Sequence, residues 1–192
     1  MKKFILSLFL TFTLVSPVLA DFESGVIQFE QGDFEGALKT LTPLAEDGDP
    51  RAQYVVGVIW LNGMVGEPRP DEAAGWLKRA AEQDYVEAQM ELARLFKTGE
   101  GVPTDLGQMV TWYRRAAQQG HVGAQLFVAD AYAYGQGVGP DLVQAYMWYE
   151  IAMRYWGDLA VHARDAIAEK MTREQIDEAR RLASAVKLPS AQ

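Results

Sequence analysis

The side chains that could carry acid–base or nucleophilic chemistry are few in this chain, and their spacing assembles no reactive group. The two histidines, His121 and His162, have no second histidine three or four residues away, so a histidine-based zinc site is not expected. The serines beyond residue 20 lie near the ends of the chain, and none follows the pattern of a nucleophile elbow. Many acidic residues, such as Asp105 and Asp141, are placed to start helices. We therefore predict no catalytic residues, no metal site, no cofactor and no enzymatic activity.

The first twenty residues are typical of a cleavable export signal. Two lysines precede an apolar run over residues 4–15, a break at Ser16-Pro17 and a small residue, Ala20. We expect cleavage after Ala20, which would place the protein in the periplasm or outside the cell, without membrane insertion after cleavage. An uncleaved membrane anchor is the alternative, for which the apolar run is short. Because the chain contains no cysteine, neither a disulfide nor a lipid on cysteine is expected.

Acidic residues dominate the charge of the chain, with 26 aspartates and glutamates against 18 lysines and arginines. Nucleic acids and anionic membrane surfaces both select for basic patches, so neither is an expected partner. The excess of negative charge favours solubility and, weakly, a basic partner.

The most informative feature of the sequence is a repeat with a period of 36 residues. Tryptophan recurs at Trp76, Trp112 and Trp148. Other columns keep the same period: Ala-Gln at 52–53, 88–89 and 124–125, glycine at 63, 99 and 135, and alanine at 80, 116 and 152. A fixed period of this length is the signature of a helical solenoid, in which each unit buries its apolar face against its neighbours.

Each unit is predicted to be a helix, a glycine-rich connector and a second helix. Ala88, Leu92 and Leu95 recur at helical spacing. Gly99 is suited to end that helix and Asp105 to cap the next one. We therefore predict an all-α fold, a right-handed α-solenoid of about five stacked antiparallel helix pairs. The expected boundaries are a signal peptide over 1–20, repeats over about 21–51, 52–87, 88–123 and 124–157, a C-terminal capping pair over 158–187, and a tail over 188–192.

The repeated residues resemble those of a known family. Ala88-Gln89, Gly99-Glu100-Gly101-Val102 and Trp112-Tyr113-Arg114-Arg115-Ala116-Ala117 are similar to the motifs of the Sel-one-like repeat (SLR) family, within the tetratricopeptide-like superfamily. The resemblance covers about residues 21–187, and the connector Gly63-Met64-Val65-Gly66 departs from it. It implies a scaffold or adaptor that assembles complexes, with envelope signalling or host interaction among the roles of exported bacterial members.

Two sets of residues are candidates for binding. Four aromatic residues lie outside the repeating columns and are predicted to form an exposed patch: Tyr134, Tyr146, Tyr155 and Trp156. The alternative is that they seal the junction with the capping pair. Three glutamines begin the first helices in register and could bind an extended peptide on the inner surface: Gln53, Gln89 and Gln125. The alternative for them is a hydrogen bond to the backbone of the preceding repeat. The recurring tryptophans are predicted to lie in the core.

These observations favour an exported scaffold that binds a protein or peptide, with the exported domain of an envelope sensor as one such partner. The alternative function is a small-ligand or cell-wall-fragment binder or hydrolase of the bacterial envelope. The absence of any assembled reactive group favours the scaffold.

Overall fold

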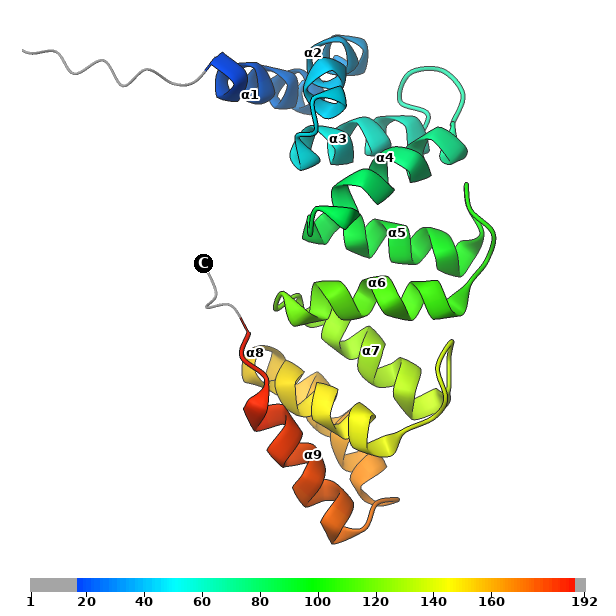
Figure 1. The fold of residues 1–192 in the computed structure, drawn as a ribbon, viewed down its shortest axis with the longest axis vertical. Helices are drawn as coiled ribbons and strands as arrows, with labels where there is room; N and C mark the ends of the chain where they lie inside the picture. The colour runs from blue at the N-terminus through cyan, green and yellow to red at the C-terminus, as the bar shows by residue number, and fades with distance from the viewer. Residues whose placement is uncertain (1–16, 189–192) are drawn as a thin grey trace, which may run out of the picture.

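The computed structural model describes residues 17–188, apart from the side chains of residues 17–20 and 155–159. Over these residues the chain is helical, without strands, and its helices stack one after another into an elongated array (Figure 1). The helices of this part of the chain are α1 (Pro17–Glu30), α2 (Phe34–Glu46), α3 (Pro50–Leu61), α4 (Pro70–Glu82), α5 (Val86–Thr98), α6 (Leu106–Gln118), α7 (Val122–Tyr134), α8 (Leu142–Ala168) and α9 (Arg173–Ala185). The all-α solenoid predicted from the sequence is confirmed. None of these helices is both long and apolar enough to cross a membrane.

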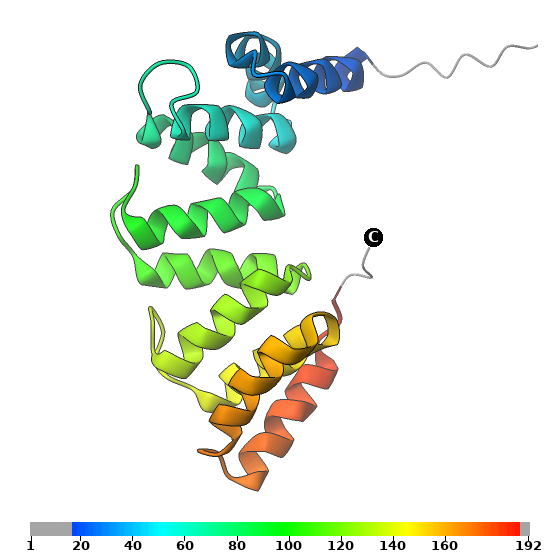
Figure 2. The same ribbon diagram turned by 180° about the vertical axis from the view of Figure 1, so that it is seen from behind.

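Each helix packs against the next helix in the chain, so the array is built from sequential antiparallel pairs. The long connectors within the repeats, residues 62–69, 99–105 and 135–141, lie along one edge of the array, on the right in Figure 1 and on the left in Figure 2. The short turns between repeats lie along the opposite edge. The first helices α3, α5 and α7 start two residues before the repeat starts expected from the sequence.

The connectors end and restart helices as predicted. Gly99 and Gly135 follow α5 and α7 with φ of 78° and 70°, the left-handed conformation that favours glycine. The carboxylate of Asp105 accepts a hydrogen bond from the backbone amide of Gln108 at 3.0 Å, in the first turn of α6. Asp141 caps α8 in the same way. Local capping therefore fixes where α6 and α8 begin, whereas α4 begins at Pro70 without a side-chain cap.

Small residues let the two helices of a repeat approach closely. Gly57, Ala93 and Ala129 occupy one column of the repeat, and all three are buried. A Cβ atom added at Gly57 would lie 2.9 Å from Cγ of Leu77, so α3 and α4 pack with no room for a larger residue.

The recurring tryptophans fill the core in the later repeats. Trp112 and Trp148 are 7% and 4% exposed, as predicted. Trp76 is only half-buried, and the guanidinium of Arg79 lies over its ring at 4.7 Å. The core prediction is therefore confirmed for two tryptophans and corrected for the first.

The C-terminal end is closed by a long helix and a capped one. α8 continues without a break from the fourth repeat through residue 157 to Ala168, in a stretch of sequence that contains no proline. Thr172 then forms the predicted N-cap of α9: its hydroxyl accepts from the amide of Gln175 at 3.3 Å, and the Gln175 side chain accepts from the amide of Thr172 at 2.9 Å. Charged side chains cover the outside of α9, as in the ion pair of Glu178 and Arg181.

The apolar core divides into two clusters. The smaller cluster joins α2 and α3 and includes Leu41, Val56 and Ile59. The larger cluster runs from Leu61 to the end of α9. Trp60 is partly buried against both clusters. The smaller cluster therefore joins the N-terminal helix pair to the first helix of the next repeat.

The N-terminal end of the array exposes an apolar side chain, Ile27, which is 52% exposed. Gly25 of α1 and Gly57 of α3 occupy matching positions, because a Cβ atom at either would meet a leucine of the following helix. Ile27 is therefore in register with Ile59, which is fully buried by its neighbours in the array. In α1 the corresponding side chain has no preceding repeat against it among the described residues.

Candidate functional site

The helix α7 is apolar on the face that it turns away from the core as well as on the face that it buries. Its core side presents Ala124, Val128 and Ala131, all essentially buried. Its outer side carries Phe127 and Tyr134, which are 43% and 71% exposed. A surface helix normally has polar residues on its outer face, and α7 carries only one charged residue, Asp130. This helix is therefore the first place to look for a binding surface.

Two buried tyrosines, Tyr113 and Tyr149, support the exposed residues of α7. The ring of Phe127 stacks on that of Tyr113, with centroids 4.5 Å apart and planes inclined by 10°. Asp130, one turn further along α7, accepts a hydrogen bond from the hydroxyl of Tyr149. Tyr134 lies two turns beyond Phe127 on the same face. We call these five residues, Tyr113, Phe127, Asp130, Tyr134 and Tyr149, the α7 surface.

Charged residues of α5 border the α7 surface. The guanidinium of Arg94 binds two carboxylates, Glu91 at 2.7 Å and Glu100 at 2.8 Å. The ammonium of Lys97 lies 5.9 Å from the centroid of the Phe127 ring. Carboxylates therefore lie beside aromatic rings along this side of the array.

Burial and neighbouring negative charges raise the pKa values of two tyrosines in this region, Tyr113 and Tyr149. Burial, and then the charge of Glu91, raise the pKa of Tyr113, while Arg94 lowers it in part. Burial, and then the hydrogen bond to Asp130, raise the pKa of Tyr149. These phenols therefore stay neutral at ordinary pH and do not act as bases.

Of the aromatic residues predicted to form an exposed patch, Tyr134 is exposed and Tyr146 is not. Tyr146 is 2% exposed, which corrects the expectation that it lies outside the core. Its column of the repeat is buried throughout, with Ala74 and Val110 at the equivalent positions. The larger ring of Tyr146 packs toward α9, where the guanidinium of Arg180 lies 5.9 Å from its centroid. The side chains of Tyr155 and Trp156 lie outside the described residues.

The three glutamines predicted as a possible peptide ladder are buried and hydrogen-bonded to the preceding repeat. The side-chain amides of Gln53, Gln89 and Gln125 donate to the backbone carbonyls of Ala45, Ala81 and Ala117, at 3.0, 3.1 and 3.2 Å. These hydrogen bonds are the ones expected for the structural alternative. The amide groups join successive repeats and do not face a partner.

The glutamines also form a second, side chain to side chain link. Gln83 donates to Gln53 Oε1, and Gln119 donates to Gln89 Oε1, both at 2.9 Å. The residue thirty positions after Gln125 is Tyr155 instead of glutamine, and no donor to the buried Gln125 Oε1 is found among the side chains that the structure describes. The link is therefore interrupted at the repeat that carries the α7 surface.

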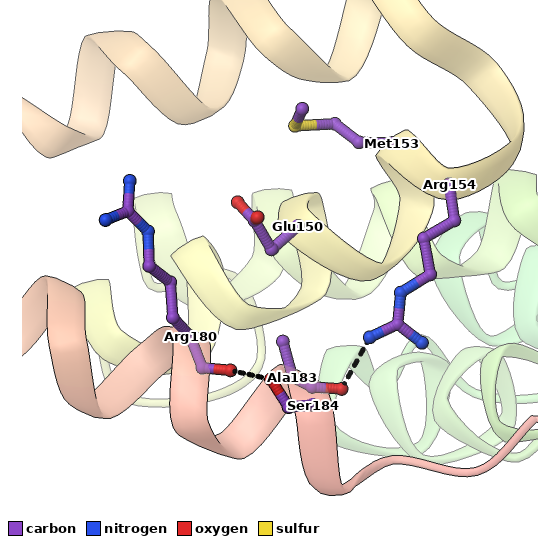
Figure 3. A pocket seen from close by; sticks show the side chains of 6 residues that line it. All are labelled: Glu150, Met153, Arg154, Arg180, Ala183 and Ser184. Carbon is purple, nitrogen blue, oxygen red and sulfur yellow. Dashed lines mark hydrogen bonds between the residues drawn. The ribbon is translucent and has the colours of Figure 1, made fainter.

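A cavity of about 460 Å³ lies between α8 and α9, and Figure 3 shows Glu150 between the side chains of Arg154 and Arg180. Arg154 donates to the carbonyl of Ala183 at 2.8 Å, in the last turns of α9. Glu150 pairs with Arg164 at 3.2 Å. Arg154 therefore connects α8 to α9, and the pair of Glu150 and Arg164 lies within α8; we assign both to the capping of the array.

The fold and this surface define the class of the protein: a helical-repeat protein with an aromatic patch on one of its first helices. Comparison with known proteins names the family. Residues 50–85, 86–121 and 122–153 each match the model of the Sel1 repeat, so that more than half of the chain is covered. The chain belongs to the Sel1 repeat family, which confirms the resemblance found in the sequence.

Two solved structures are similar to this one. A protective antigen present in uropathogenic Escherichia coli strains, which displays an SLR fold, aligns with a TM-score of 0.72 and 29% identity over 86% of this chain and 37% of that protein. A Sel1 repeat protein from Oxalobacter formigenes aligns with a TM-score of 0.67 and 24% identity over 88% of this chain and 78% of that protein. The second likeness shows the fold alone.

A curated relative has a partial match. An F-box protein of Arabidopsis thaliana is 34% identical over 96 residues, which make up 50% of this chain and 27% of that protein. This chain therefore spans about a quarter of the length of that relative. Sel1 repeat proteins generally act as protein–protein interaction scaffolds, and their fold is typically not enzymatic.

Proposed function

We propose that this protein is an exported scaffold that binds a protein or peptide partner through the α7 surface. The observation that carries the proposal is the pair of exposed aromatic side chains, Phe127 and Tyr134, on one face of α7. Exposed apolar side chains that share one face mark a binding site more than single ones do, and tyrosine is enriched at binding hot spots. Tyr113 and Tyr149 hold the neighbouring groups in place, so a partner would meet a surface that is already ordered.

The photo-crosslinking experiment tests the binding surface in living cells. A photoreactive residue at Tyr134 should give an adduct with a specific protein, whereas the same residue at Lys39, exposed on α2, should not. Phe127→Ala should lower the yield of the Tyr134 adduct, because it removes half of the aromatic pair. The exported domain of an envelope sensor is the partner class to seek first among the adducts. Equal adducts at both positions, or none at either, would contradict the proposal.

The export component of the proposal has a separate test. Its support is the basic start, apolar run and small-residue ending of residues 1–20. Cleavage after Ala20 would leave residues 21–30 of α1 in the mature protein. Mass spectrometry of the protein from a periplasmic or extracellular fraction should therefore find Asp21 at the N-terminus. A chain that keeps residues 1–20 and sediments with membranes would instead support the uncleaved anchor.

A further inference from the structure

The carboxylate at the centre of the α7 surface has no cationic partner among the side chains described in the structure. Asp130 accepts a hydrogen bond from the neutral hydroxyl of Tyr149. No lysine or arginine among the residues with described side chains lies within ion-pair distance of it. Arg94, by contrast, binds both Glu91 and Glu100. Asp130 is therefore a negative charge held in a fixed position and left without a counter-charge.

Aromatic rings surround this charge on the same side of the array. Tyr149 contacts Asp130 directly, and Tyr134, the most exposed ring of the surface, lies one turn further along α7. The faces of aromatic rings attract cations, most strongly where water is partly excluded. Lys97 already lies 5.9 Å from the Phe127 centroid, which shows that a cation and a ring of this surface can be neighbours.

The neighbouring first helix α5 carries two carboxylates and two cations, and Glu100 follows it with a third carboxylate. α5 presents Glu87 and Glu91 toward Tyr54, and both charges, after burial, raise the pKa of that phenol. Together with Asp130, the three carboxylates of Glu87, Glu91 and Glu100 outnumber the two cations of this region, Arg94 and Lys97. The whole chain has the same sign, with a formal charge of −8.

We infer that the partner segment presents an arginine or lysine side chain beside Asp130 and an apolar side chain against the Phe127 ring. This inference rests on the function proposed above and adds the chemistry of the partner to it. Burial of a guanidinium or ammonium against Asp130 would supply the missing counter-charge, and the exposed ring of Tyr134 would contact its carbon chain. An acidic partner would instead place like charges together, which weakens binding.

The test uses the purified full chain and a phage-displayed library of random peptides as the probe. Panning on the wild-type protein, with counter-selection on Phe127→Ala, should enrich peptides that carry arginine or lysine within a few residues of an aromatic residue or leucine. A synthetic copy of an enriched peptide should bind Asp130→Asn about tenfold more weakly than wild type, and its affinity should fall as salt is raised. Asparagine keeps an oxygen that accepts from Tyr149, so this variant isolates the charge.

Two control variants remove the same kinds of group as Asp130→Asn and Phe127→Ala, but far from the α7 surface. Glu46→Gln removes an exposed carboxylate at the end of α2 and should leave the affinity unchanged. Ile27→Ala removes an exposed apolar side chain from α1 and should also leave it unchanged. Urea unfolding of each variant checks that a loss of binding is not a loss of folded protein.

The outcomes separate the inference from the function on which it rests. Enriched peptides that are acidic or neutral, or that bind Asp130→Asn as tightly as wild type, would overturn the inference while Phe127→Ala still loses binding. Peptides that bind Phe127→Ala and wild type equally, or a panning that enriches nothing, would overturn the proposed function itself.

Discussion

The ring of Tyr113 lies almost flat against that of Phe127, although the two residues belong to consecutive repeats. Tyr113 is 5% exposed, and Phe127 covers it while remaining 43% exposed itself. One ring of the pair is thus part of the core and the other part of the surface. This arrangement allows the contribution of each ring to folding and to binding to be separated by mutation.

Truncation of the two rings should have unequal effects on stability. Tyr113→Ala should lower the free energy of unfolding by about 3–5 kcal/mol, because it leaves a cavity in the core. Phe127→Ala should cost only about 0.5–1.5 kcal/mol, the range expected for the loss of one ring–ring contact. Urea unfolding followed by circular dichroism measures both. A cost for Phe127→Ala as large as that for Tyr113→Ala would mean that Phe127 serves the fold and not a partner.

The two glutamine positions Gln89 and Gln125 should differ in how well they tolerate leucine. Gln89→Leu deprives the carbonyl of Ala81 and the amide of Gln119 of their hydrogen-bond partners. We expect it to lower the free energy of unfolding by about 1–3 kcal/mol. Gln125→Leu also removes a buried oxygen that has no donor, so its cost should be smaller. Chemical unfolding of the two variants side by side measures the difference, and equal costs would show that the second link between repeats adds no stability.

Two glycines in one helix pair should respond to alanine with opposite signs. Gly57→Ala places a Cβ atom 2.9 Å from Leu77 Cγ and should destabilise the protein by about 1–3 kcal/mol. Gly75→Ala, on the exposed side of α4, meets no atom within 4 Å and should stabilise the helix by about 1 kcal/mol. Midpoints of thermal unfolding report both effects. A stabilised Gly57→Ala variant would show that α3 and α4 can separate without loss.

The hydrogen bond between Tyr149 and Asp130 predicts a dependence of stability on alkaline pH. Burial and this hydrogen bond raise the pKa of Tyr149 in the folded protein above its unfolded value of about 10. The resulting stability is fully present below the unfolded pKa and is lost as pH rises toward the folded pKa. Asp130→Asn removes the negative charge, so the pKa of Tyr149 should fall toward its ordinary value and less stability should be lost.

Absorbance of tyrosinate during a pH titration gives the direct measurement of that effect. Tyr149 should ionise at a lower pH in the Asp130→Asn variant than in the wild-type protein. Tyr54, whose pKa is raised by burial and by Glu91 and Glu87, should not move. Identical titration curves for the two proteins would show that Asp130 has no influence on the Tyr149 phenol.

The fold was largely predictable because the columns that build it repeat in residue type. Alanine, glycine and tryptophan recur at fixed positions, since helix packing, helix ends and core filling impose the same demand in every unit. Tyr146 was misassigned because its column is buried but does not keep its residue type, with alanine and valine at the equivalent positions. The side chain at this position becomes larger from repeat to repeat toward α9. A search for repeated residue types does not detect a position at which only burial is conserved between repeats.

The α7 surface was only partly predictable for the opposite reason. Tyr134 was identified as an aromatic residue outside the repeat, but Phe127 and Asp130 were not selected. In the earlier repeats, the position of Phe127 is occupied by Val55 and Glu91. The position of Asp130 is occupied by Val58 and Arg94. A helical position that changes from apolar to charged between repeats is free of the demands of packing. Columns of that kind mark the surface where one repeat protein differs from another.

The division of the apolar core has a consequence for how the array comes apart. Because α1 and α2 meet the rest of the array mainly through α3, in the smaller cluster, this N-terminal pair can open while the later repeats stay closed. Limited proteolysis would then trim the chain from α1 inward and leave a resistant fragment that contains α5 to α9. The α7 surface lies within that fragment, so a partner held there would stay attached even when the opposite end of the array frays.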